Sequence, residues 1–308
     1  MDDEYLDAFE ALIGDDEIPY SRDLNNRITM QRNKLDGYLF FDLWSSDVAG
    51  VADMSSLYPP QSLDMLRDLY IQVITAESDV LKQRCILYYL KKDFSEEAAD
   101  EFCESTAFPA TQKKLVDGIY ALDRFDFETA MRNLTAPGVR LQFTEKMLLT
   151  LLQYSDNGPR YVRMLVFTSR PKLDSKNCKK LYLEALSRIS VSSALEFVRT
   201  TTPIEDRAEY LQSMIGFCLS TGKPSSAYDI ANLPLLDYEE AMILDYLMSK
   251  PDASAKNILL VRELHRGQAG AAREATGPMK NQISFGTKRT TQWAEMARKL
   301  KTNPAQIL

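Results

Sequence analysis

Helical periodicity, interrupted at short intervals by proline, is the feature that most constrains what this chain can fold into. In SLDMLRDLYIQVIT (62–75), apolar residues recur at the i, i+3, i+4 spacing of a single helix face. The segment ESDVLKQRCILYYLKK (77–92) repeats the pattern, with Ser78 as its expected N-cap. Convincing strands of alternating apolar and polar residues, joined by hairpin turns, are absent. We therefore predict that nearly all of residues 60–265 is helical.

Proline-containing turns divide this body into segments the length of one helix or one helix pair. A succession of short amphipathic helices is typical of an α-solenoid, in which each pair buries its apolar face on its neighbours. The segments echo one another without a fixed repeat length. We predict an all-α fold, namely an irregular α-solenoid of helix pairs over residues 35–265, followed by a flexible basic C-terminal tail over residues 266–308. The turns lie at Pro109, Pro137, Pro159, Pro171, Pro203, Pro224, Pro234 and Pro251.

The stretch GIYALDRFDFETAMRNLTAP (118–137) predicts one helix pair in detail. Its first helix should end near Asp123, and Asp126 is placed to cap the second. The second helix has apolar residues at i, i+3, i+4 and i+7, and the small Ala130 among them should let the paired helices approach closely. The predicted core of this pair consists of Leu122, Phe127, Ala130 and Leu134.

Charge is distributed unevenly along the chain. Residues 1–255 hold 27 Lys and Arg against 41 Asp and Glu, a net charge of −14, whereas residues 256–308 hold ten against three, a net charge of +7. The first 17 residues contain eight acids and no base, unlike a secretory signal or transit peptide, so we expect an intracellular protein. We predict that residues 1–34 form an acidic, partly ordered segment. One helix face in it would consist of Tyr5, Leu6, Phe9 and Leu12.

Residues suited to catalysis, cofactors or metals form no recognisable constellation. The four cysteines are far apart, and His265, the one histidine, completes neither a zinc site nor a catalytic triad. A phosphate-loop-like stretch fails because Pro224 replaces the Ser or Thr that would bind magnesium. Glu97 and Glu101 lack the histidine partners of a di-metal bundle, which favours a solvated face. We predict no enzyme activity, no cofactor, no metal, no small-molecule substrate and, because no apolar run approaches roughly 18 residues, no membrane span.

The tail contains one amphipathic segment, TQWAEMARKLK (291–301), preceded by a Gly- and Ala-rich stretch. It predicts a short helix near residues 292–301, too short to be stable alone, so its apolar face must be buried on something. Two interpretations remain open: the helix folds back on its own body, or it docks on a partner, since Trp, Met and Arg are enriched at interfaces. Direct nucleic-acid binding is not predicted, because the basic residues are sparse. The candidate partner-binding residues are Phe285, Trp293, Met296, Arg298 and Leu300, with Trp293 as the main contact.

The run QKKLVDGIYALDRFDFETAMRNLTAPGV (112–139) resembles the central signature of the ELYS-like nuclear pore complex assembly family. That signature is a helix ending in a Leu-Asp pair, then an aromatic-x-x-Ala-x-x-x-Leu helix and a proline stop. The flanking segments LYIQVIT, CILYYLKKDF and MLLTLLQYSDNGPRYVRMLVFTSRP are also similar, and the resemblance covers roughly residues 35–250. The matching residues here are Leu122, Asp123, Phe127, Ala130, Leu134 and Pro137.

This resemblance implies an all-helical scaffold nucleoporin at the nuclear envelope, docked on the Y-shaped coat subcomplex of the nuclear pore. The implied partners are a WD40 β-propeller subunit and a propeller-plus-solenoid subunit of that complex. Pore assembly, mRNA transport and protein transport are the implied processes. The chain resembles the short fungal form, and it has no Gly-Arg-Pro core of the AT-hooks that large animal members carry. A generic helical adaptor of another coat or of a ubiquitin-ligase assembly would show the same periodicity and is the alternative hypothesis.

Overall fold

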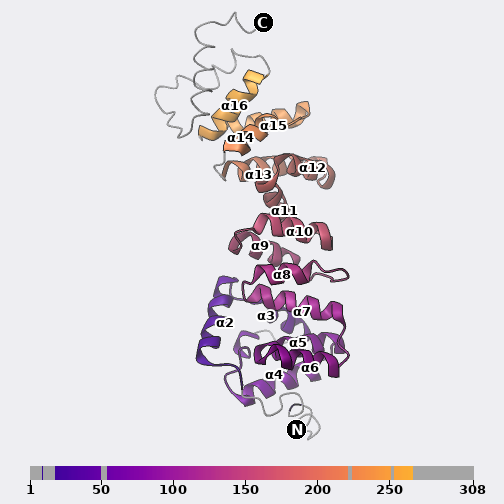
Figure 1. Cartoon of the computed structure of the whole chain (residues 1–308). Helices are drawn as coiled ribbons and strands as arrows, with labels where there is room; N and C mark the ends of the chain where they lie inside the picture. The colour runs from indigo at the N-terminus through magenta and orange to yellow at the C-terminus, as the bar shows by residue number, and fades with distance from the viewer. Residues whose placement is uncertain (1–8, 10–17, 50–53, 221–223, 251–252, 266–308) are drawn as a thin grey trace, which may run out of the picture. The chain divides into compact units, whose positions relative to one another are not determined.

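The structure is a computed structural model that describes Phe9 and residues 18–49, 54–220, 224–250 and 253–265 (Figure 1). Within these ranges the chain forms fifteen α-helices and two short 3-10 helices, and no strand. The prediction of an all-α fold is therefore confirmed. None of the described helices is both long and apolar enough to cross a membrane.

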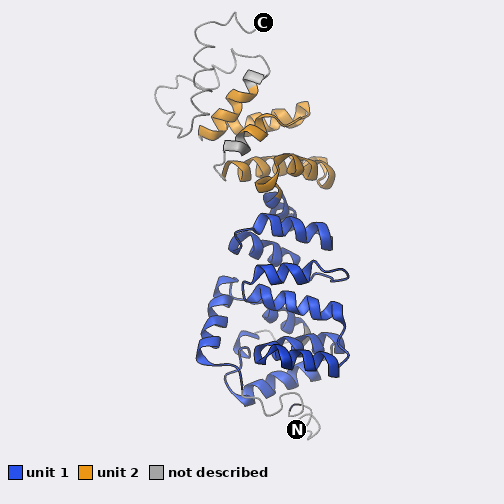
Figure 2. Cartoon of the chain, in the orientation of Figure 1, with its two compact units in different colours: residues 1–185 blue, residues 186–308 orange. Residues whose placement is uncertain are grey.

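The chain divides into two compact units, residues 1–185 and residues 186–308 (Figure 2), and helix α11 (Lys176–Ile189) includes the boundary. The stacking of helix pairs into a solenoid stays a prediction. The protease resistance of residues 35–265 as a single body also stays a prediction, and limited proteolysis tests it. Unit 1 contains α2 (Arg22–Lys34), α3 (Phe40–Ala49), η1 (Met54–Ser56), α4 (Leu63–Thr75), α5 (Val80–Phe94), α6 (Glu96–Ser105), α7 (Ala110–Asp123), α8 (Phe127–Leu134), α9 (Thr144–Tyr154) and α10 (Gly158–Ser169). Unit 2 contains α12 (Val191–Thr201), η2 (Ile204–Asp206), α13 (Arg207–Ser220), α14 (Pro224–Ala231), α15 (Asp237–Met248) and α16 (Ala253–His265).

Local capping explains where several helices begin. The Ser62 hydroxyl accepts a hydrogen bond from the Met65 N–H at 3.2 Å and starts α4. Helix α5 starts after Asp79, whose carboxylate accepts from the Leu81 N–H at 2.8 Å. The expected cap Ser78 was therefore wrong by one residue, because the carboxylate of Asp79 is the side chain that bonds a free N–H of the first turn.

The core of unit 1 is built around α3, which contacts both α5 and α7 although these helices come much later in the chain (Figure 1). The Phe41 ring lies 4.4 Å, between centroids, from both the Tyr58 ring and the Tyr89 ring. All three aromatic side chains are fully buried. Because aromatic side chains bury the largest areas, this cluster is expected to dominate the stability of unit 1.

The α7–α8 pair, which the sequence predicted in detail, packs closely at a glycine of α7. A Cβ atom added to Gly118 of α7 would lie 2.5 Å from the Leu134 side chain of α8. Ala130 of α8 is also fully buried. The sequence indicated Ala130 as the small residue that allows this approach, whereas the structure also places Gly118 directly against α8.

We expect Ala130→Leu to lower the free energy of unfolding by about 1–3 kcal/mol, because the added carbons have no space in a packed helix pair. The measurement is urea denaturation followed by circular dichroism. Ala110→Leu, at the exposed first residue of α7, is the matched control and should change stability little. Equal stability of the two variants would show that Ala130 does not limit the approach of α7 and α8.

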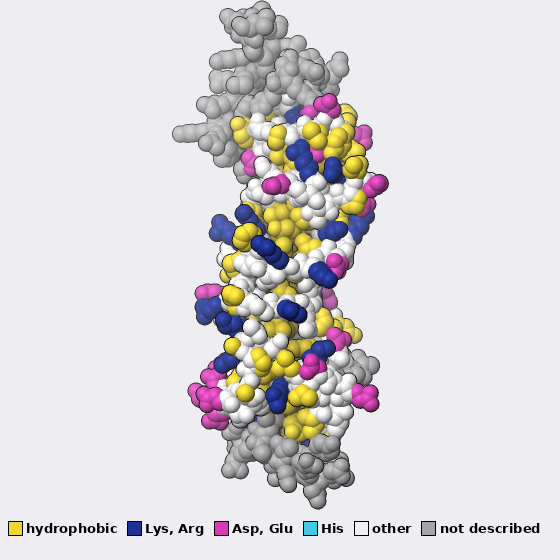
Figure 3. All heavy atoms as spheres, turned by 90° about the vertical axis from the view of Figure 1, so that its right-hand side faces the viewer, with side chains coloured by type: hydrophobic (Ala, Val, Ile, Leu, Met, Phe, Trp, Pro, Cys, Tyr) yellow, Lys and Arg dark blue, Asp and Glu magenta, His cyan; other side chains and the backbone are white. Residues whose placement is uncertain are grey.

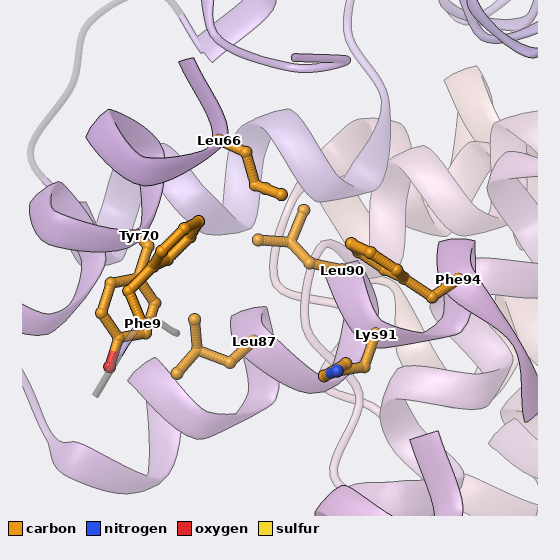
Figure 4. Close-up of a pocket in the computed structure, with 7 residues that line it drawn as sticks. All are labelled: Phe9, Leu66, Tyr70, Leu87, Leu90, Lys91 and Phe94. Carbon is orange, nitrogen blue, oxygen red and sulfur yellow. The ribbon is translucent and has the colours of Figure 1, made fainter. Parts of the chain in front are cut away.

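Phe9 is buried in the core of unit 1. Its side chain is only 2% exposed and lies between α4 and α5, with its ring 5.4 Å from the Tyr70 ring (Figure 4). The Arg67 guanidinium is 5.6 Å from the Phe9 ring. The other members of the predicted apolar face, Tyr5, Leu6 and Leu12, lie outside the described residues. The remaining void, about 10 Å³, is too small for a ligand, and it is lined by Phe9, Leu66, Tyr70, Leu87, Leu90, Lys91 and Phe94.

In unit 2, two adjacent acids at the start of α15 connect different helices. Arg199 of α12 donates two hydrogen bonds to the Glu239 carboxylate, at 2.9 and 2.6 Å. Arg262 of α16 donates to the Glu240 carboxylate at 2.6 Å. Both carboxylates are buried, so the arginines compensate charges that would otherwise be costly inside the protein.

Candidate partner-binding site at the α7–α8 turn

The residues between α7 and α8 form a tight turn whose side chains enter two buried polar clusters and one aromatic cluster. Helix α7 ends at Asp123, and the Asp126 carboxylate accepts from the Thr129 N–H at 3.1 Å, which confirms the predicted cap of α8. Between them, Phe125 has a left-handed backbone, with φ of 61°. A bulky residue with this φ is uncommon, and such outliers concentrate at functional sites.

Asp123 points into the core and caps a helix 83 residues earlier in the chain. Its carboxylate accepts from the Phe40 N–H at 2.8 Å and the Phe41 N–H at 3.1 Å, both at the start of α3. The Tyr89 hydroxyl donates to the same carboxylate at 2.9 Å. Asp123 therefore fixes α3 against α7 by accepting hydrogen bonds from first-turn N–H groups that have no backbone acceptor within α3.

Burial raises the pKa of the Asp123 carboxyl to about 7, although the hydrogen bonds from Phe40, Phe41 and Tyr89 act to lower it. All of its donors belong to the surrounding helices. The Asp123 carboxylate thus holds α3 and α5 against the end of α7.

Arg124, the next residue, forms the centre of a second polar cluster. Its guanidinium donates to the Asp93 carboxylate of α5 at 2.5 Å, and the Asp93 side chain is completely buried. The same carboxylate accepts from three tyrosine hydroxyls, at 2.8 to 3.1 Å. Burial raises the pKa of Asp93, and the Arg124 charge opposes that shift. The three tyrosines are Tyr20, Tyr58 and Tyr120.

Phe125 and Phe127 are partly buried against the core of unit 1 and line an open surface hollow of about 440 Å³. The Phe125 ring centroid is 5.8 Å from that of Phe127 and 5.2 Å from that of Tyr154, and both pairs meet edge to face. The Lys34 ammonium lies 5.5 Å from the Phe125 ring centroid. The complete lining is Lys34, Phe125, Phe127, Glu128, Tyr154, Ser155, Asp156, Asn157 and Tyr161.

This hollow has the chemistry of a protein-docking site. Four aromatic side chains supply apolar area, and Lys34, Glu128 and Asp156 supply a charged rim. Its volume lies within the range of ligand sites, about 300–1,000 Å³. No group of three or more His, Cys, Asp or Glu side chains in the described part of the chain is arranged to hold a metal ion. Most of the exposed surface that lines the hollow is polar, so a partner segment would have to supply polar as well as aromatic contacts.

The structure separates the predicted site residues into three groups. Leu122, Ala130 and Leu134 are fully buried in the α7–α8 pair. Phe127 is only partly buried and lines the hollow. The five predicted tail residues, Phe285, Trp293, Met296, Arg298 and Leu300, lie outside the described residues.

Sequence reasoning missed the roles of Gly118, Arg124 and Phe125. Gly118 did carry a signal, because glycine inside a helix costs about 1 kcal/mol and so indicates a packing reason. The pairing of Arg124 with Asp93 left no signal in the sequence, because the two residues are 31 positions apart and Arg124 follows α7 whereas Asp93 belongs to α5. The orientation of Phe125 depends on its left-handed backbone, which no local pattern predicted.

The four cysteines form no disulfide, and Glu97 and Glu101 are both exposed on α6, as the sequence indicated. Together, these observations define an all-α protein whose helices are joined by buried polar contacts.

Comparison with known proteins identifies the family. The ELYS family model, described as nuclear pore complex assembly, matches residues 38–250, more than half of the chain. The chain is also similar to the ely5 protein of Schizosaccharomyces pombe, which is described as an uncharacterized protein. The two are 32% identical over 264 residues, which cover 84% of this chain and 86% of the yeast protein. The chain belongs to the ELYS family, a structural family of nuclear pore assembly, and this membership implies an association with the nuclear pore and nuclear envelope.

Proposed function

We propose that this protein is a scaffold nucleoporin that docks on the Y-shaped coat subcomplex of the nuclear pore and contributes to pore assembly and to mRNA and protein transport. The proposed partners are a WD40 β-propeller subunit and a propeller-plus-solenoid subunit. The observation that carries the proposal is the match to the nuclear pore assembly family over residues 38–250. Helices of both compact units lie within that match.

The aromatic hollow supports a binding role on physical grounds. Two of its aromatic residues, Phe125 and Phe127, belong to the α7–α8 turn and the start of α8. Asp123 and Arg124 fix that turn from inside. A rigid platform that presents aromatic side chains loses little conformational entropy on binding, which favours affinity. The hollow is thus a proposed contact point for a Y-complex subunit.

Affinity capture of the tagged full-length chain from nuclear-envelope extract tests this proposal. We expect Y-complex nucleoporins to dominate the captured proteins, at a constant ratio to the bait. Capture of subunits of another coat or of a ubiquitin ligase, without nucleoporins, would instead support the generic adaptor.

We further propose that the tail segment from Phe285 to Leu300 is a linear anchor for a partner nucleoporin, with Trp293 as its main contact. The support is its sequence, in which a Trp, Met and Leu stripe lies opposite basic residues and follows a Gly- and Ala-rich leader.

We expect deletion of residues 276–308 to leave the melting temperature of the body nearly unchanged and to weaken binding to the purified Y complex. The reason is that the tail's apolar stripe would be buried only in the complex. Calorimetry and binding titration provide the two measurements. Trp293→Ala should reproduce the loss of affinity, whereas Thr290→Ala is the matched control. A truncated protein that melts earlier but binds normally would show that the tail is an internal strut.

A further inference from the structure

Helix α10 carries an exposed stripe that the family signature at the α7–α8 turn does not include. Arg160, Arg163, Met164 and Phe167 follow the i, i+3, i+4, i+7 spacing and lie on one side of the helix. Phe167 is 75% exposed and Met164 is 39% exposed. We call these four residues the α10 face.

The opposite side of α10 is buried and holds the helix rigidly. Val162 and Leu165 are fully buried in the core of unit 1, and Gly158 is buried at the start of the helix. An apolar side chain as exposed as Phe167 contributes little to folding, because nearly all of its surface remains in water. Its position on a fixed helix is instead suited to binding.

The surroundings of the α10 face are basic in an acidic protein. Residues 157–173 contain four bases, Arg160, Arg163, Arg170 and Lys172, and no acid, whereas residues 1–255 as a whole have a net charge of −14. None of these four bases forms an ion pair with a carboxylate in the described ranges of the chain. The space-filling view shows exposed hydrophobic side chains next to Lys and Arg side chains on one side of the molecule (Figure 3).

The aromatic hollow lies beside the first turn of α10, although none of the four residues of the α10 face lines it. Tyr161, the residue after Arg160, lines the hollow, and the turn that precedes α10 contributes Ser155, Asp156 and Asn157 to it. A segment that leaves the hollow along α10 would therefore meet the two arginines and then Phe167.

We propose that the α10 face binds an acidic protein segment that carries an apolar side chain, supplied by the Y-complex partner; this inference rests on the proposed function. The guanidinium groups of Arg160 and Arg163 would each bind a carboxylate, a geometry for which arginine is well matched. Phe167 and Met164 would be buried against the apolar side chain of the segment. Aromatic residues, Met and Arg are enriched at protein interfaces, and buried aromatic anchors dominate binding energy.

Nucleic acid is the competing polyanion, and two observations favour protein. The α10 face places apolar Met164 and Phe167 beside its arginines, whereas a phosphate backbone is bound by a denser stripe of bases. The acidic remainder of residues 1–255 would also repel a long polyanion.

The test compares binding of the full-length chain and its variants to the purified Y-shaped coat subcomplex. We expect Phe167→Ala, and separately the double variant Arg160→Glu with Arg163→Glu, to weaken binding by about tenfold or more. The charge-reversal variant should also show a weaker salt dependence than the wild type, because charge–charge attraction is screened by salt. Both variants should retain the melting temperature, since the substituted side chains are exposed.

Matched controls on α2 use residues equally exposed in the same unit. Met30→Ala removes a side chain that is 62% exposed, and the double variant Arg22→Glu with Arg27→Glu reverses two exposed charges. Both controls should bind like the wild type. Equal binding by the α10 variants and the controls would overturn the proposal while leaving the proposed function intact.

Two further outcomes are decisive. If the wild-type chain does not bind the Y complex at all, the proposed function is wrong and this inference falls with it. If the wild type binds a short DNA duplex more tightly than the Y complex and the arginine variant loses that binding, the face is a nucleic-acid site.

A benzophenone cross-linker placed at position 167 then checks the chemistry of the partner. The cross-linked peptide should be acidic, and a basic peptide would contradict the proposal.

Discussion

Arg124→Ala is expected to lower the free energy of unfolding by about 3–5 kcal/mol, because it leaves the buried Asp93 carboxylate without its cation. Three tyrosine hydroxyls would still donate to Asp93, but they carry no charge to compensate it. Urea denaturation followed by circular dichroism provides the measurement. The matched control is Arg132→Ala, which breaks an exposed ion pair with Glu128 and should cost less than about 1 kcal/mol.

The loss of unfolding free energy caused by Arg124→Ala should depend on pH. Burial already raises the folded-state pKa of Asp93 above its ordinary value, and removal of Arg124 would raise that pKa further. A carboxyl with a raised folded-state pKa favours the folded state at low pH, and this contribution is lost as the pH rises through that pKa. The deficit of Arg124→Ala relative to the wild type should therefore be larger at about pH 8 than at about pH 5.

The double variant Asp93→Asn with Arg124→Met distinguishes the cost of an unpaired buried charge from the cost of lost side-chain packing. It removes both charges, so its cost should be smaller than the sum of the two single substitutions. A strictly additive result, or an Arg124→Ala variant as stable as Arg132→Ala, would show that the Asp93–Arg124 pair does not control the stability of unit 1.

Gly158→Ala should cost about 3 kcal/mol, the upper end of the range for overpacked sites. A Cβ atom at this position would lie 2.2 Å from the Leu151 carbonyl oxygen and 3.0 Å from the Leu152 Cα. Both are backbone atoms of α9, so no side-chain rotation relieves the clash. The two helices must separate, and the turn that contributes Ser155, Asp156 and Asn157 to the hollow must move with them. We therefore expect weaker binding to the Y complex as well as lower stability.

Gly216→Ala in α13 is the matched control for this substitution. Its added Cβ would meet only the Tyr246 hydroxyl, at 3.2 Å, which is the end of a flexible side chain. The substitution should be neutral or stabilising by up to about 1 kcal/mol, because alanine favours helix more than glycine does. If both variants are equally stable, α9 and α10 are not in backbone contact at Gly158.

The two predictions address different parts of the proposed binding site. Arg124 holds the α7–α8 turn from inside the core, and Gly158 holds α10 against α9. Partial exposure of Phe127 also lowers the expected cost of Phe127→Ala below the 3–5 kcal/mol that applies to a fully buried phenylalanine. A Phe127→Ala variant is thus suited to testing the hollow without unfolding unit 1.

The sequence by itself determined the helices of this protein, because periodicity and capping depend on residues within a few positions of one another. It predicted α4, α5, α7 and α8, the Asp126 cap and the family to which the chain belongs. These signals are local or, for the family signature, continuous along the chain.

Only the tertiary structure decided which side chains meet across the chain. The bonds from Asp123 to the start of α3 join residues 82 and 83 positions apart, and the bond from Arg124 to Asp93 joins residues 31 positions apart. The position of Phe125 beside Phe127 and Tyr154 follows from the left-handed turn next to those contacts. Such contacts form where helices pack, and packing depends on all the apolar faces together, so no single segment of sequence specifies them.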